Sequence, residues 1–248
     1  MVQMADTLYL SLWYPNLRLE ALPGKLAAVL GAFAAHGGES TVYAATVWPV
    51  SWNEAPVFQR LWGRCAGGHQ QGAEPRQAVD EATELLHDDY AYEFQIGWSL
   101  WELEAGSAGA LPAARPAPGP STRPLGEIAR EKSSNSGAHE NTDFVGLDRR
   151  WVRESRLARV TGLGPLFDEA AYEQEGHIKV DLGSDAPFLE EDAGLGQVGA
   201  KHVEENVRQL VDLAAAIEKG SGATARLLWS ELGESLAQRL AGRLGAGN

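Results

Sequence analysis

Residues 92–103 read YEFQIGWSLWEL, and the alternation in this stretch decides the fold class. Large apolar side chains recur at every second position: Tyr92, Phe94, Ile96, Trp98 and Leu100. The positions between them hold a mixed set that includes Glu93, Gln95, Ser99 and Trp101. Successive side chains of a strand point to opposite faces of its sheet. The stretch therefore predicts a long strand with one buried face and one mixed face.

The residues before this strand alternate between strand and helix signals. Segments 7–14 and 41–50 are rich in β-branched and aromatic residues, which favours strands, and 56–62 could add a short one. Segments 22–38 and 74–89 each have a proline suited to a first helical turn, and apolar residues at helical spacing. The order predicts an α+β fold for residues 1–104: a ferredoxin-like antiparallel sheet with helices on one face.

A second half is predicted over residues 143–248. It has signals for three strands and two C-terminal helices, at 155–164, 177–182 and 224–229, and at 200–219 and after Ser230. This order is consistent with two related halves packed together. The only direct sign of duplication is the tripeptide SLW, at 11–13 and again at 99–101.

Residues 105–142 differ from both halves in composition. Proline, glycine, serine and alanine dominate, and large apolar side chains are almost missing. Such a segment cannot bury enough surface to offset the entropy of ordering it. We expect a linker or a long mobile loop there.

The composition narrows the classes of partner. The 248 residues carry a formal net charge of −13, and the sequence pI is about 4.9. Such a surface repels nucleic acids and anionic lipid and favours a basic partner. Cys65 is the single cysteine, so no internal disulfide can form. No signal-peptide pattern or membrane-length apolar run occurs, which predicts a cytoplasmic protein.

Residues 194–207, GLGQVGAKHVEENV, match the glycine pattern of dinucleotide-binding loops. That pattern needs a strand ending at its first glycine and an acidic residue ending the next strand. The predicted strand 177–182 ends well before Gly194, and the acidic residue at the right distance, Asp212, falls inside the predicted helix. We therefore expect no nucleotide and no other cofactor.

The acidic stretch 181–192 has the length of a calcium-binding loop. Glycine at 183 and alanine at 186 occupy positions where such a loop needs an oxygen ligand and a glycine. A solvated acidic loop is the simpler interpretation. A metal-assisted hydrolase that uses Asp181 and Asp185, with Glu190 or His177 brought close by the fold, is the alternative function.

Arginines recur in residues 148–159, DRRWVRESRLAR. Arginine suits phosphate and carboxylate groups, so Arg150 and Arg153 form a candidate anion site. Pairing with the chain's own carboxylates is the simpler expectation in so acidic a protein.

The aromatic side chains suggest a binding face. If Leu8, Leu10 and Leu12 face the core, Tyr9 and Trp13 face away from it, on the same side as Trp101. The second half could cover this face. If the face is open, aromatic side chains with acidic neighbours suit a protein partner.

These observations lead to one main functional hypothesis. The hydrolase, zinc and phosphate-loop motifs G-x-S-x-G, H-E-x-x-H, paired C-x-x-C and the P-loop do not occur. We expect a non-catalytic acidic binding protein: an inhibitor, an immunity-type protein or a regulatory partner of a basic protein. The predicted anchors are Tyr9, Trp13 and Trp101, and the predicted steering charges are Glu190, Glu191 and Asp192.

Overall fold

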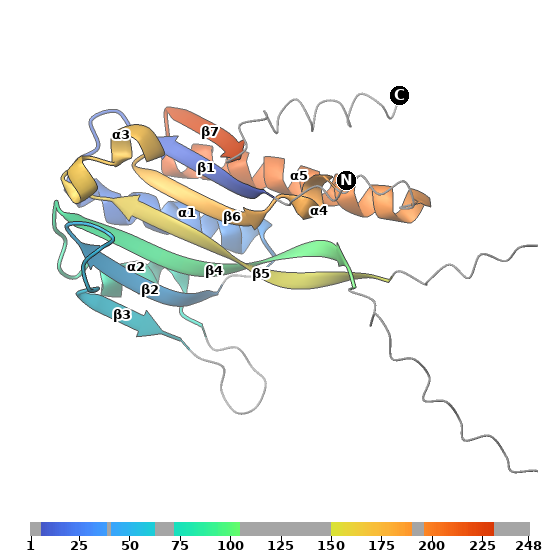
Figure 1. Cartoon of the computed structure of the whole chain (residues 1–248), viewed down its shortest axis with the longest axis horizontal. Helices are drawn as coiled ribbons and strands as arrows, with labels where there is room; N and C mark the ends of the chain where they lie inside the picture. The colour runs from blue at the N-terminus through green and yellow to red at the C-terminus, as the bar shows by residue number, and fades with distance from the viewer. Residues whose placement is uncertain (1–5, 39–40, 63–71, 105–149, 190–195, 231–248) are drawn as a thin grey trace, which may run out of the picture. The chain divides into compact units, whose positions relative to one another are not determined.

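A computed structural model describes residues 6–38, 41–62, 72–104, 150–189 and 196–230 (Figure 1). The chain divides into two units, Met1–Glu102 with Val152–Asn248, and Leu103–Trp151. In the described part of the second unit, the Glu104 amide donates to the Arg150 carbonyl at 2.8 Å.

The first unit is built on an antiparallel sheet of seven strands, in the order β3-β2-β4-β5-β6-β1-β7. The strands are β1 (Thr7–Trp13), β2 (Val42–Pro49), β3 (Phe58–Leu61), β4 (Tyr90–Leu103), β5 (Trp151–Leu163), β6 (Ile178–Ser184) and β7 (Ala225–Ser230). The α+β class is confirmed, and the alternating stretch 92–103 lies within β4.

Three helices form a layer behind this sheet (Figure 1). They are α1 (Leu22–His36), α2 (Pro75–Ala82) and α5 (Gly196–Ser221), and α1 packs against both of the others. Short helical turns complete the unit: η1 (Leu19–Ala21), η2 (Phe167–Glu169), α3 (Tyr172–Glu175) and α4 (Ala186–Leu189). No helix in the described ranges is long and apolar enough to cross a membrane.

The core lies between the sheet and the helix layer. Alternate residues of β1 and β4 fill it from the sheet side, and residues of α1 and α5 from the other: Leu8, Leu10, Leu12, Phe94, Ile96, Trp98, Val29, Phe33, Leu210 and Ile217. The Trp98 ring meets Phe33 edge to face, with ring centroids 6.1 Å apart. The buried face that the alternation predicted in β4 is therefore the face toward the helices.

The ferredoxin-like strand order is not confirmed. That order would place β1 beside the other strands of residues 1–104, whereas β1 lies between β6 and β7. The pairing matches apolar rows, because Leu10 lies opposite Val180 on one side and Leu228 on the other. Both predicted halves therefore contribute strands to one sheet, with β1 inserted between strands of the second half, and the packing of two related halves is not confirmed either.

The domain boundaries at 104 and 143 stay predictions. The predicted linker, 105–142, lies outside the described residues, and so does the helix predicted after Ser230.

Candidate functional site

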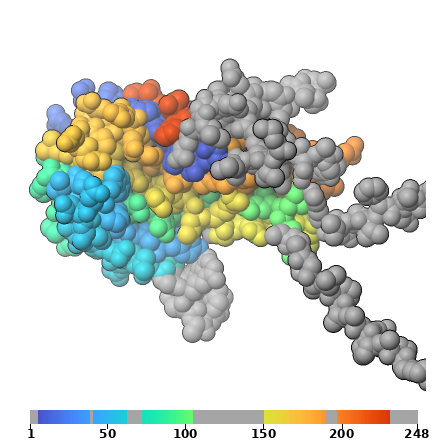
Figure 2. Space-filling view, viewed as in Figure 1, coloured from blue at the N-terminus to red at the C-terminus, as the bar shows by residue number. Residues whose placement is uncertain are grey.

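The face of the sheet opposite the helices carries a cleft of about 230 Å³. Figure 2 shows the molecule from this side. The cleft is lined by Tyr9, Trp52, Glu93, Arg159, Thr161, Leu163, Glu175, Lys179 and Asp181. Four strands (β1, β4, β5 and β6) contribute these side chains, together with the loops that follow β2 and β5. We call this hollow the sheet-face cleft.

Strand register brings charges of opposite sign into one row of the cleft. Asp181 pairs with Tyr9 on one side and with Arg159 on the other. Arg159 Nε lies 3.8 Å from Glu93 Oε2 on the next strand. Burial raises the pKa of Glu93, Arg159 opposes this shift, and the negative charge of Asp181 adds to it. The protonated form of Glu93 is therefore favoured relative to a carboxyl in water.

A second row joins a lysine to aromatic rings. Lys179 Nζ lies 3.1 Å from Glu175 Oε2 and 4.8 Å from the centroid of the Tyr9 ring. Tyr9 also stacks on Trp229, with centroids 4.7 Å apart. Trp229 is fixed in turn, because its Nε1 donates to Ser11 Oγ at 3.1 Å. Tyr9 is thus held in place by contacts within the chain.

Three loops meet at one end of this face. They are residues 50–57, 87–90 and 164–177. Backbone hydrogen bonds join them: the Val50 amide donates to the Asp89 carbonyl at 2.8 Å, and the Asp168 amide to the Val50 carbonyl at 2.7 Å. In Figure 2, residues around 55 (light blue) and around 170 (gold) gather at the left end.

The acidic and basic residues of these loops are unequal in number. They hold seven carboxylates and no lysine or arginine: Glu54, Asp88, Asp89, Asp168, Glu169, Glu173 and Glu175. They also expose the large apolar side chains of Val50, Trp52 and Leu166. Trp52 is 40% exposed, meets Phe167 edge to face and also lines the sheet-face cleft. We call these three loops the acidic loop end.

The backbone of the acidic loop end is strained. Val50, Asp168, Glu169 and Ala170 have φ values of 57°, 46°, 53° and 67°. In the described chain, Asn16 is the only other non-glycine residue in this left-handed region. Such conformations cost free energy and persist where surrounding contacts hold them, often at binding surfaces. The hydrogen bonds made by the Val50 amide and carbonyl supply such contacts.

The predicted anchors are only partly brought together. Tyr9 lies in the sheet-face cleft, and Trp13 is half-buried at the end of β1. Trp101 lies eight residues beyond Glu93 along β4, which is about 26 Å at about 3.3 Å per residue. Its ring contacts His202 of α5, with centroids 4.1 Å apart. Glu190, Glu191 and Asp192 lie outside the described residues.

The two aspartates of the alternative hypothesis bind different backbone amides. Asp181 Oδ1 accepts the Gly183 amide at 2.9 Å, within the cleft strand. Asp185 is buried, and its Oδ1 accepts the Asp6 amide at 2.9 Å. The described residues contain no group of three or more His, Cys, Asp or Glu side chains that could hold a metal ion. Asp185 therefore has a structural contact with the backbone. Among the described residues, no third His, Cys, Asp or Glu side chain joins Asp181 and Asp185 as a possible metal ligand.

Arg153, one of the two residues of the predicted anion site, contacts side chains of this chain. Its guanidinium donates to Gln209 Oε1 at 3.3 Å and lies 5.4 Å from the centroid of the Trp101 ring. Arg156 is paired with Glu102. Arg150 is exposed and belongs to the second unit. The contacts of Arg153 and Arg156 are to the chain itself, and an anion site at Arg150 and Arg153 stays a prediction.

Two residues could not be singled out from the sequence: Trp52 of the sheet-face cleft, and Trp229, which stacks on the cleft residue Tyr9. Trp52 follows a strand signal in a loop, and Trp229 ends a short apolar run, so neither had a pattern that marked it. Only the pairing of β1 with β7 shows that Trp229 and Tyr9 are neighbours. No protein-family model, no curated protein and no solved structure matches this chain.

Proposed function

We propose that this chain is a non-catalytic acidic binding protein, an inhibitor or immunity-type partner that neutralises a basic protein. Its docking surface is the acidic loop end together with the sheet-face cleft. One observation carries the proposal: seven carboxylates, without a lysine or arginine among them, belong to the same three joined loops as the exposed side chains of Val50, Trp52 and Leu166.

The charge and the apolar side chains of this surface have different roles in binding. Negative charge on one surface attracts a basic partner and speeds the encounter, and it does so most strongly at low salt. Affinity then comes from a few large side chains that lose their water. Trp52 is placed for this role, because it belongs to the acidic loop end and to the cleft at once.

The cleft supplies specificity in the same proposal. Its ion pairs, Arg159 with Glu93 and Lys179 with Glu175, lie at a partly exposed surface. A partner's charged groups can exchange with these pairs, because exposed ion pairs are held weakly. Tyr9 serves as a second anchor beside Trp52, and the cytoplasm is the proposed compartment.

The experiment uses the full chain, isolated gently from its own host and measured by native mass spectrometry. We expect a basic protein to be bound, and to be released as the salt concentration rises. Two double variants of equal charge then locate the surface. Glu169→Lys with Glu173→Lys changes the acidic loop end, and Glu205→Lys with Asp212→Lys changes exposed positions of α5 in the helix layer.

The expected result is a loss of affinity of at least tenfold for the first double variant and little change for the second. Trp52→Ser should weaken the complex as well, with a smaller change in its salt dependence. Equal losses in the two double variants would show that net charge alone attracts the partner. A stoichiometric small molecule or metal ion, with no protein partner, would contradict the proposal and favour an enzyme.

A further inference from the structure

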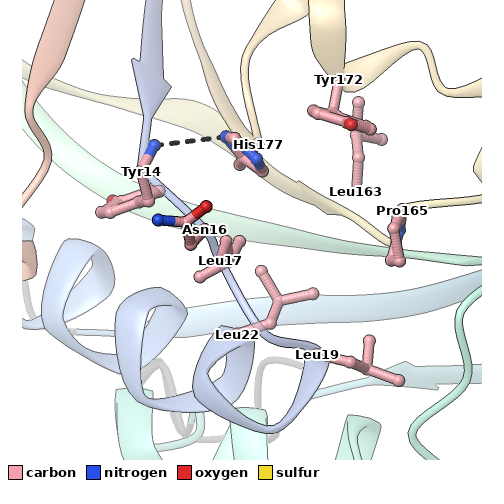
Figure 3. A pocket seen from close by; sticks show the side chains of 9 residues that line it. All are labelled: Tyr14, Asn16, Leu17, Leu19, Leu22, Leu163, Pro165, Tyr172 and His177. Carbon is pink, nitrogen blue, oxygen red and sulfur yellow. Dashed lines mark hydrogen bonds between the residues drawn. The ribbon is translucent and has the colours of Figure 1, made fainter.

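A second hollow of about 300 Å³ lies where β1 ends and β6 begins (Figure 3). Its walls are mostly apolar: Leu17, Leu19, Leu22, Leu163 and Pro165. Tyr172 and His177 line it on the side of β6, and Tyr14 and Asn16 line it just beyond β1. We call this hollow the His177 pocket. An apolar lining with few polar groups is typical of small-molecule sites, and this volume is at the small end of their range.

His177 has a defined tautomer. Its Nδ1 accepts the backbone N–H of Tyr14 at 3.2 Å, so the ring proton resides on Nε2. Burial lowers the pKa of His177, which favours the neutral ring. In Figure 3, the bond to Tyr14 leaves one edge of the ring, and the other ring nitrogen faces the cavity. His177 therefore offers the pocket a donor of fixed position, whereas the side-chain amide of Asn16, which also lines the pocket, is exposed.

Aromatic contacts hold the His177 ring in position. Tyr172 stacks on it with centroids 4.6 Å apart and an interplanar angle of 30°. Tyr14 meets it edge to face, with centroids 6.1 Å apart. A ring packed in this way loses little freedom when its N–H binds a ligand, which lowers the cost of binding.

The charge around the pocket limits what can enter. Pro165, Tyr172 and His177 belong to the loop 164–177, which holds four carboxylates and no lysine or arginine. Like charges repel, so the side of the pocket that this loop forms disfavours an anion. On the opposite side, Lys25 Nζ lies 5.2 Å from the centroid of the Tyr14 ring, but its ammonium donates to the Ser221 carbonyl at 2.6 Å.

We propose that the His177 pocket binds a small uncharged molecule with a flat apolar body and one hydrogen-bond acceptor, which takes the Nε2–H of His177. The leucine and proline walls receive the apolar body. The acceptor is a carbonyl or an aromatic nitrogen, because either can point a lone pair at the imidazole N–H. This site does not depend on the proposed protein partner.

Three small probes test the pocket: benzamide, benzoate and toluene. Benzamide has the ring and a neutral acceptor, benzoate has the same ring with a negative charge, and toluene lacks the acceptor. Titration of the full chain is followed by two-dimensional amide NMR. We expect benzamide to bind most tightly, about tenfold above toluene, because one hydrogen bond separates the two. The shifted amides should include those of His177 and Leu163.

Two variants assign the effect to the pocket. His177→Asn retains a side-chain oxygen that can accept the Tyr14 amide, and its NH2 group corresponds to the Cδ2 atom of histidine, one atom short of the Nε2 donor. Benzamide should then bind about as weakly as toluene, and toluene should be unaffected. Leu19→Trp, at a half-buried wall residue, should fill the hollow and weaken both probes at least tenfold. A dispersed amide spectrum confirms that each variant is folded.

Several results would overturn the inference. They are no binding of any probe, benzoate binding as tightly as benzamide, or unchanged benzamide affinity in the folded His177→Asn protein. Benzamide binding that survives Leu19→Trp would place the probe elsewhere and would count equally against the pocket.

Discussion

Asn206 joins α5 to two other elements and offers the sharpest test of the fold. Its side chain is fully buried in a helix face that otherwise packs apolar residues. Its Oδ1 accepts the Trp101 amide at 2.9 Å, and its Nδ2 donates to the carbonyls of Trp101 at 2.8 Å and Pro187 at 3.0 Å. The amide thus extends the pairing of β4 at a place where β2 has ended.

Asn206→Ala removes all three bonds without introducing strain. At about 1 kcal/mol for each bond, the free energy of unfolding should fall by about 3 kcal/mol. Backbone groups left buried and unpaired raise the cost, and the better helix propensity of alanine offsets part of it. At about 2–4 °C per kcal/mol, the melting temperature should fall by about 6–12 °C.

The measurement is urea unfolding followed by far-ultraviolet circular dichroism, with the denaturant slope compared between proteins. Gln209→Ala is the graded control, because Gln209 Nε2 donates one part-buried bond to the Ser99 carbonyl at 3.0 Å and its Oε1 accepts only an exposed bond from Arg153 at 3.3 Å. It should cost about 1 kcal/mol or less. Asp212→Ala, at an exposed position of the same helix, should change stability by less than about 0.5 kcal/mol.

Asn206→Asp adds a test of direction. The carboxylate keeps the acceptor for the Trp101 amide but faces the two carbonyls that the amide nitrogen had bound. It should destabilise the protein at least as much as alanine does. If Asn206→Ala lowers the free energy of unfolding no more than Gln209→Ala does, the three hydrogen bonds of Asn206 do not stabilise the fold. Apolar packing alone then holds α5 in place.

Three further predictions concern strain and pH. Val50→Gly should raise the free energy of unfolding by about 1 kcal/mol in urea unfolding, because glycine adopts the positive φ without steric cost; a loss of stability would contradict the strain. The folded pKa of His177 lies below its ordinary 6.5, so the unfolded chain binds the proton first as pH falls. The free energy of unfolding should therefore decrease as pH falls below 6.5. His177→Asn should reduce this pH dependence, measured from unfolding curves at several pH values. Glu93 has the opposite sign: its folded pKa lies above the ordinary 4.5, so its contribution falls as pH rises from 4.5 through the folded pKa, and Glu93→Gln should remove that fall. An unchanged pH profile in either variant would show that the residue does not carry the shift.

Local pattern was enough to predict the strands of the sheet, the helices α1, α2 and α5, and the α+β class. The alternation at 92–103 and the leucines of β1 have a period of two, and prolines in the first turns of α1 and α2 begin helices. These signals can be read from neighbours along the chain, because backbone geometry gives strands and helices their own periods. The net charge and the outward position of Tyr9 likewise needed no tertiary structure.

Tertiary structure decided the rest, because pairing and register depend on residues far apart in sequence. The position of β1 between β6 and β7 places Tyr9 opposite Asp181 and Trp229. The acidic loop end gathers carboxylates from three separate loops, none of which is exceptional alone. Trp101 and Glu93 are both at odd-numbered positions of the alternating stretch. Trp101 lies so far along β4, however, that its ring contacts His202 of α5. A period of two assigns a side chain to a face of the sheet, and only the arrangement of strands determines its neighbours there.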